Sequence, residues 1–143
     1  GKSHMAACIA NDLIDEGYKV LMTNFATMVN ILQSSFEGRQ EYINSLNRYA
    51  LLIIDDLGAE RKSDYMQEQV FNIIDARCRS GLPMIITSNL TMTELTEPTE
   101  IMCQRIYDRI LERCHPIEMI GASRRIGKGR TEYKQTKMLL KGD

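Results

Sequence analysis

The apolar run YALLII at residues 49–54 ends at two adjacent carboxylates, Asp55 and Asp56, and it constrains the fold more than any other segment. A strand with one face in water alternates apolar and polar side chains, whereas this run does not alternate. We therefore expect a central strand of a parallel sheet that is covered by helices on both faces. Its charged residues lie at the carboxyl end, where ligands bind in sheets of this kind.

Helical and strand patterns alternate along the rest of the chain. Gly17 and Gly81 follow two stretches in which apolar residues recur at helical spacing, and Thr91 and Glu94 have the spacing of a capping box. Pro98 is expected in the first turn of the last helix. We expect helices at residues 3–16, 26–36, 64–79 and 98–113, and further short strands at 19–23, 84–87 and 116–120. This order favours an α/β fold with a parallel sheet.

The composition is that of one globular domain and excludes some functions. Of the 143 residues, 43% are hydrophobic and 26% are charged, which is enough apolar material for a core. The net charge of -1 gives no overall attraction to nucleic acid or membrane, so any DNA contact must be local. No apolar run approaches the roughly 20 residues of a membrane span. The four cysteines lack metal-ligand spacing, and we expect a reduced, cytoplasmic protein with no membrane partner.

The chain opens with Gly1-Lys2-Ser3, which matches the second half of the phosphate-binding loop G-x-x-x-x-G-K-[ST]. These residues precede an amphipathic helix, and the amides at a helix N-terminus attract phosphate. The lysine would reach the β- and γ-phosphates of a nucleotide, and the serine hydroxyl would hold Mg2+. Alternatively, residues 1–5 are vector-derived, since Gly-Ser-His-Met is a common cloning scar.

Carboxylates and an amide follow two of the expected strands. Asp55 would help to hold Mg2+, as an aspartate after a buried strand does in P-loop enzymes, and Asp56 would polarise the attacking water. Asn89 follows the strand at 84–87 and would contact the γ-phosphate or position the water. The alternatives are a turn or helix cap for the two aspartates and an ordinary loop residue for Asn89.

Arg105, Arg109 and Arg113 recur at every fourth position and therefore line one face of the last expected helix. A basic stripe of this kind is usually a solvated surface. An arginine that reaches the γ-phosphate of a neighbouring subunit would instead stabilise charge in the transition state, which is the role of an arginine finger. Spacing alone leaves both interpretations open.

Three motifs in this order, Gly-Lys-Ser-His, Ile-Ile-Asp-Asp-Leu-Gly-Ala-Glu and Ile-Thr-Ser-Asn, resemble the DnaC/DnaI helicase-loader family and its transposition relatives, the IstB ATPases. The resemblance runs from residue 1 to about residue 125. It implies a P-loop NTPase core of the AAA+ type, a three-layer α/β/α fold that binds ATP and Mg2+. The residues that it assigns are Gly1, Lys2, Ser3 and His4 in Walker A, Asp55 and Asp56 in Walker B, and Asn89 as sensor 1.

The last segment resembles the family more loosely. The Asp-Arg pair that ends at Arg109 resembles the arginine-finger helix, which implies that Arg109 acts in trans on a neighbouring subunit. The Ser-Arg-Arg segment that ends at Arg125 resembles the Ser-x-Arg element of sensor 2, which implies a catalytic role for Arg125. Arg105 is the alternative candidate for the arginine finger, and Arg124 is the alternative candidate for sensor 2.

Two parts of the family pattern are missing from the sequence. They are the first strand with the glycine-rich half of Walker A, and the N-terminal region that binds the helicase. We therefore expect residues 1–143 to be an N-terminally truncated AAA+ domain, with a basic tail or helix at about 121–143. Nucleotide binding by this chain alone is expected to be weak or undetectable, because Lys2 lacks most of the loop amides that cradle phosphates.

The favoured hypothesis is an ATPase that loads a replicative helicase during DNA replication. The parent protein would bind ATP with Mg2+, self-associate through the ATPase site, and escort the helicase onto single-stranded DNA in the primosome. The basic tail would contact DNA phosphates, unless it is a solvated helix. One alternative is an IstB-like transposition helper that acts on duplex DNA. The other is a non-hydrolysing nucleotide-binding scaffold, because Asp56 replaces the usual glutamate and a shorter carboxylate places water less well.

Overall fold

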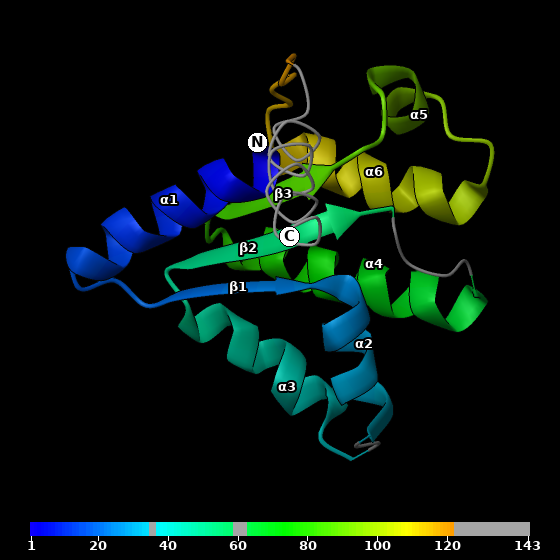
Figure 1. The fold of residues 1–143 in the computed structure, drawn as a ribbon. Helices are drawn as coiled ribbons and strands as arrows, with labels where there is room; N and C mark the ends of the chain where they lie inside the picture. The colour runs from blue at the N-terminus through cyan, green and yellow to red at the C-terminus, as the bar shows by residue number, and fades with distance from the viewer. Residues whose placement is uncertain (35–36, 59–62, 122–143) are drawn as a thin grey trace, which may run out of the picture.

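The sheet is parallel and has the expected strand at its centre. A computed structural model describes residues 1–34, 37–58 and 63–121. Within them, β1 (Val20–Asn24), β2 (Leu51–Leu57) and β3 (Met84–Ser88) form a sheet in the order β1-β2-β3, and the three arrows point the same way (Figure 1). Because β2 pairs in parallel with both neighbours, the carboxyl ends of all three strands lie at one edge.

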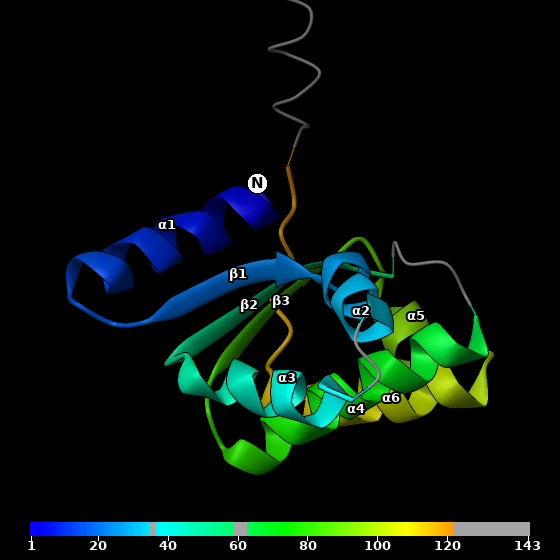
Figure 2. The same ribbon diagram turned by 90° about the horizontal axis from the view of Figure 1, so that it is seen from below.

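Helices cover both faces of this sheet, as Figure 2 shows. On one face lies α1 (Lys2–Asp15). The other face is covered by α2 (Phe25–Ser34), α3 (Arg39–Ser45), the 3-10 turn η1 (Leu46–Arg48), α4 (Asp64–Ser80) and α6 (Ile101–Arg113). A short helix, α5 (Met92–Thr96), follows β3. In the described residues, no helix combines the length and the apolar character that crossing a membrane requires.

Alternate residues of β2 supply the two cores of the domain. Leu51 and Ile53 pack in a small cluster with Ala6 and Ala10 of α1, whereas Leu52 and Ile54 belong to the larger cluster on the opposite face. None of the four β2 residues is more than 5% exposed. Burial on both faces explains why the sequence of β2 does not alternate, and it confirms the three-layer α/β/α arrangement.

Local caps set several helix boundaries. The hydroxyl of Ser63 accepts a hydrogen bond from the Met66 amide at the start of α4, and Gly81 ends that helix with a φ of 70°, which glycine adopts without strain. The capping box is confirmed: the Glu94 amide donates to Thr91 Oγ1 at 3.2 Å, and the Thr91 amide donates to Glu94 Oε2 at 2.7 Å. The hydrogen bonds that the Glu94 carboxylate accepts from the amide and the hydroxyl of Thr91 lower the pKa of Glu94 below its ordinary value.

Two expectations about the last third of the chain are wrong. Residues 116–120 form no strand, and Ile117 and Ile120 are 84% and 89% exposed. A strand needs a neighbour for its backbone hydrogen bonds, and within the described residues none pairs with this segment. Pro98 lies between two helices and not inside one, because α5 ends at Thr96 and α6 begins at Ile101.

The spacing of apolar residues in the sequence did not predict α3 or η1. A seven-residue helix spans only two turns, so the few apolar residues at 39–48 show no clear period. Their burial becomes evident only in the folded chain, where Ile43 and Leu46 join the larger core.

Arg77 of α4 connects this missed turn to the sheet. The side chain is 1% exposed, and its guanidinium donates to four backbone oxygens: Leu46 at 3.1 Å, Tyr49 at 3.1 Å, Ala50 at 3.3 Å and Pro83 at 2.7 Å. Burial lowers the pKa of the guanidinium from its ordinary value. One buried side chain therefore ties the segment before β2 to the residue before β3.

Replacement of Arg77 by Lys should lower the free energy of unfolding by about 2 to 4 kcal/mol, because a single ammonium cannot donate to both segments. Urea denaturation followed by circular dichroism measures the change. Arg79→Lys is the matched control, since the Arg79 side chain is 73% exposed on the same helix, and it should change stability by less than about 0.5 kcal/mol. Equal losses in the two variants would contradict a special role for Arg77.

Candidate active site

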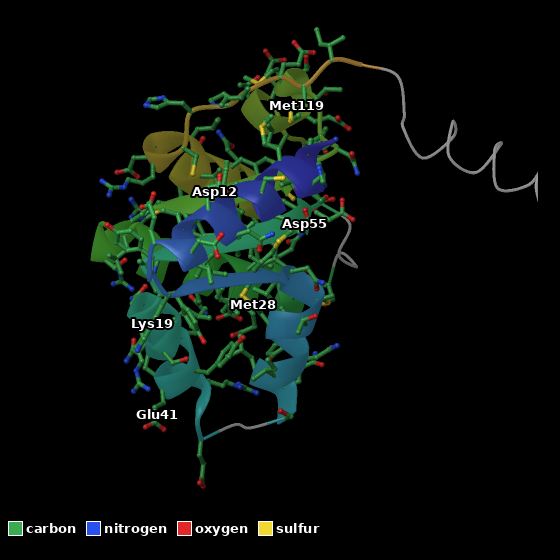
Figure 3. The ribbon with its side chains drawn as sticks, turned by 60° about the vertical axis from the view of Figure 1, so that its left-hand side comes forward. Asp12, Lys19, Met28, Glu41, Asp55 and Met119 are labelled. Carbon is green, nitrogen blue, oxygen red and sulfur yellow. The ribbon has the colours of Figure 1, made fainter. Side chains whose placement is uncertain are left out.

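Residues from three elements meet at the carboxyl edge of the sheet. Lys2 Nζ, in the first turn of α1, donates to Asn89 Oδ1 at 2.8 Å, and Asn89 Nδ2 donates to Asp56 Oδ1 at 3.1 Å. The three residues are separated by 87 and 33 positions in the sequence, so only the fold brings them together. Figure 3 shows Asp55 at the same end of the sheet as the start of α1. The hydrogen bonds thus join three of the predicted site residues in one series.

A second pair of contacts links the two aspartates to β3. Thr87 Oγ1 donates to Asp55 Oδ1 at 2.5 Å and accepts a hydrogen bond from the Asp56 amide at 3.0 Å. Thr87 is 7% exposed and is one of the few buried polar side chains in the described residues. Sequence reasoning did not identify Thr87 as a site residue. The available signal was a hydroxyl at the end of an apolar strand, two residues before the predicted Asn89.

The two aspartates lie where β2 departs from regular strand geometry. The register between β2 and β3 shifts between Ile54 and Leu57, and Asp56 has a φ of 65°. This left-handed conformation costs a residue other than glycine about 1 to 2 kcal/mol. Gly58 follows with a φ of 93°, and a Cβ there would lie 3.2 Å from the Leu90 side chain. The backbone is therefore bent at the point where its carboxylates are presented.

The start of α1 suits an anion. Gly1 is the N-cap residue, and its carbonyl accepts the Met5 amide at 2.9 Å, while the first amides of a helix have no partner inside the helix. The first turn contains no acidic residue that would repel a phosphate. His4 is exposed, and its Nε2 lies 3.8 Å from Cys8 Sγ along α1, so the structure does not place it with Lys2 and Asn89.

The oxygen donors at this edge fit Mg2+ bound together with a nucleotide. No group of three or more His, Cys, Asp or Glu gathers in the residues that the structure describes. Mg2+ does not require such a group, because it binds through one or two protein oxygens, water and substrate phosphates. The half-buried carboxylate of Asp55 and the half-buried hydroxyl of Ser3 are donors of this kind.

Arg109 lies away from the site of its own chain. Its Nε is 3.1 Å from Asp75 Oδ1 and its Nη1 is 2.8 Å from Glu112 Oε2, and the Glu112 contact raises its pKa above the ordinary value. Gln67 near the start of α4 donates to Glu100, the N-cap residue of α6, at 2.8 Å, so the two helices run side by side in the same direction. Arg109 is therefore near their C-terminal ends, and there α4 donates hydrogen bonds to backbone oxygens just before β2 and β3, at the edge of the sheet opposite the site.

The other arginines have separate environments. Arg105 stacks over the Phe71 ring, with its guanidinium carbon 4.5 Å from the ring centre. Together with Arg109 it lines an open hollow of about 330 Å³ on the surface of α4 and α6. Arg124 and Arg125, like the rest of the basic tail, lie outside the described residues.

Curated relatives of this chain include replicative helicase loaders. The replicative helicase loader DnaC of Escherichia coli K12 is 31% identical over 114 residues, which cover 77% of this chain and 45% of DnaC. The replicative helicase loader DnaI of Bacillus subtilis 168 is 28% identical over 137 residues, which cover 87% and 44%. The chain thus spans less than half the length of these relatives.

Structural similarity and the family profile agree with these relatives. A crystal structure of DnaI matches 84% of this chain and 68% of its own length, with a TM-score of 0.68 and 28% identity. The profile described as IstB-like ATP binding protein matches residues 1–132, which include all of the site residues described above. The chain has a partial core of the AAA+ P-loop type and belongs to the family of IstB-like ATP binding proteins.

Proposed function

We propose that the full-length protein containing this chain binds and hydrolyses ATP with Mg2+ and loads a replicative helicase during DNA replication. The observation that supports the proposed ATPase activity is the hydrogen-bonded series from Lys2 through Asn89 to Asp56. A phosphate held by Lys2 would lie beside both aspartates, where charge develops during phosphoryl transfer. The helicase-loading role is supported by the relatives DnaC and DnaI.

Each residue of the series has a distinct role in this proposal. Lys2 exchanges its contact with Asn89 for the γ-phosphate, and the amides at the start of α1 bind the phosphates. Asn89 stays hydrogen-bonded to Asp56 and orients the phosphate or the attacking water, which Asp56 polarises. Ser3 and Asp55 would hold Mg2+, which neutralises charge on the phosphates when it is bound.

Self-association completes the site in this proposal. Arg109 is too far along α6 to serve its own chain, but it lies on an exposed surface that a neighbour can approach, with 41% of the side chain accessible. We assign it the role of an arginine finger in trans, and Arg125 that of sensor 2. The protein would act in the cytoplasm within the primosome, and the tail at 121–143 would contact single-stranded DNA.

A transposition helper remains the second candidate, because the matching profile is that of IstB-like proteins. Both candidates use the same ATPase site, so the site cannot distinguish them. A non-hydrolysing scaffold is the third, and its support is the short carboxylate of Asp56 at the position of the water-polarising residue.

Two variants of the full-length protein test the site itself. Lys2→Ala should weaken Mg2+-dependent binding of a fluorescent ATP analogue by at least about tenfold, because a hydrogen bond to a charged group is lost. Asp56→Asn should retain binding but lower steady-state turnover by about 100-fold or more. Unchanged binding by Lys2→Ala would contradict the P-loop assignment. A wild-type protein that binds ATP without turnover, even with helicase and DNA present, would favour the scaffold.

The action of Arg109 in trans is testable by mixing variants. Arg109→Ala should bind nucleotide normally but lose turnover, while Arg79→Ala, which removes another partner of Asp75, should keep both. A mixture of Arg109→Ala and Lys2→Ala should regain part of the turnover, since the second variant supplies an intact arginine to the first. Failure of the mixture to regain any turnover would argue against a finger acting in trans.

DNA preference separates the two biological roles. We expect the full-length protein with ATP to retain a replicative helicase on a single-stranded oligonucleotide in a pull-down, and to prefer that strand to a duplex of the same length. Retention on either DNA should weaken as salt increases, because binding depends on phosphate contacts. Stronger retention on duplex DNA, without a helicase, would support the transposition helper instead.

A further inference from the structure

We propose that Thr87 is a positioning residue of the ATPase site, and that its single hydroxyl sets the orientation of the Asp55 carboxylate and the backbone conformation of Asp56. The inference rests on the proposed ATPase function and deepens it. It assigns a role to a residue that touches neither nucleotide nor water itself and acts through the two aspartates.

The hydrogen-bond geometry at Thr87 is directional. A hydroxyl has one proton to donate and can accept through its lone pairs. An amide can only donate, so the 3.0 Å contact with the Asp56 N–H must use a lone pair of Thr87 Oγ1. The hydroxyl proton is therefore the one donated in the 2.5 Å hydrogen bond to Asp55 Oδ1. The two contacts use different parts of one group, and neither competes with the other.

The contact with Asp55 controls how that carboxylate is presented. Thr87 binds Oδ1, and no other hydrogen bond to the Asp55 side chain occurs in the described residues, so rotation of the carboxylate depends on this one donor. Hydrogen-bonded partners of metal-binding carboxylates orient them, and loss of such a partner commonly reduces metal affinity about 10- to 100-fold. Thr87 is 7% exposed, so water has little room to replace it.

The contact with Asp56 stabilises an unfavourable backbone. Asp56 has a φ of 65° inside the irregular part of β2, and successive side chains of a regular strand point to opposite faces. Relaxation to regular strand geometry would therefore turn the Asp56 carboxylate away from Asn89. The Thr87 hydroxyl fixes the amide of this residue from the neighbouring strand, and so keeps the carboxylate on the side of Lys2.

Ser88 provides a comparison within the same strand. Its hydroxyl also bridges β3 to the end of β2, donating to the Leu57 carbonyl at 2.8 Å and accepting from the Leu90 amide at 3.0 Å. These partners are backbone groups, and neither is a carboxylate. Ser88→Ala therefore removes a hydroxyl that joins the same two strands without touching Asp55 or Asp56.

The experiment compares Thr87→Val, Thr87→Ser and Ser88→Ala in the full-length protein. We expect Thr87→Val, which keeps the shape but removes the hydroxyl, to lower the affinity for Mn2+ in the presence of a non-hydrolysable ATP analogue about 10- to 100-fold, measured by electron paramagnetic resonance. Turnover should fall with it, while binding of the analogue in EDTA stays unchanged. Thr87→Ser and Ser88→Ala should retain both Mn2+ affinity and turnover.

The outcomes separate a positioning hydroxyl from a packing role. If Thr87 acted only by packing, Val would preserve activity and Ser would lose it, which would overturn the inference. An active wild type with an equally active Thr87→Val would also overturn it and leave the ATPase intact. A wild type that neither binds nor hydrolyses ATP would overturn the proposed function and the inference together. If thermal melting shows that Thr87→Val is not folded, Thr87→Ser becomes the test of the inference. Retained Mn2+ affinity and turnover in Thr87→Ser would support the inference, and their loss would overturn it.

Discussion

The parallel pairing of β2 with β3 is the constraint on which the site depends. Since both strands run in the same direction, Asp55 and Thr87 reach the same edge of the sheet and form a hydrogen bond across it. The shift in register after Ile54 then places two consecutive aspartates beside β3. Helix α1 brings Lys2 to this edge from the layer above, so the site needs both the sheet and one covering helix.

Much of this arrangement was predictable because its signals are local. An apolar run that does not alternate predicts a strand buried on both faces, and parallel topology then predicts that Lys2, Asp55, Asp56 and Asn89 converge. The role of Thr87 was not predictable, because it depends on the register between two strands and on an irregularity in one of them. Sequence patterns report which face of an element is apolar, but not which hydroxyl reaches which carboxylate.

The remaining differences have the same origin in tertiary contacts. Residues 116–120 include two isoleucines, which favour strands, yet strand structure requires a neighbour that the described residues do not supply. Helical spacing placed Arg105 and Arg109 on one face of α6, as the structure confirms, but it did not predict that one stacks on Phe71 while the other pairs with acidic residues. The contacts of Arg77 were likewise not predictable, since its four acceptors are backbone oxygens, which every residue type has.

The two cores differ greatly in size, and the difference bears on local stability. Helix α1 meets the sheet through the buried Ala6 and Ala10 and the partly buried Leu13, whereas the opposite face holds most of the buried apolar residues. Segments with little buried surface open locally at a lower free energy than the rest of a domain, and amide exchange detects such opening. A nucleotide that contacts both Lys2 and Asp55 would link α1 to β2. It would therefore suppress local opening in α1, which buries only two of its residues.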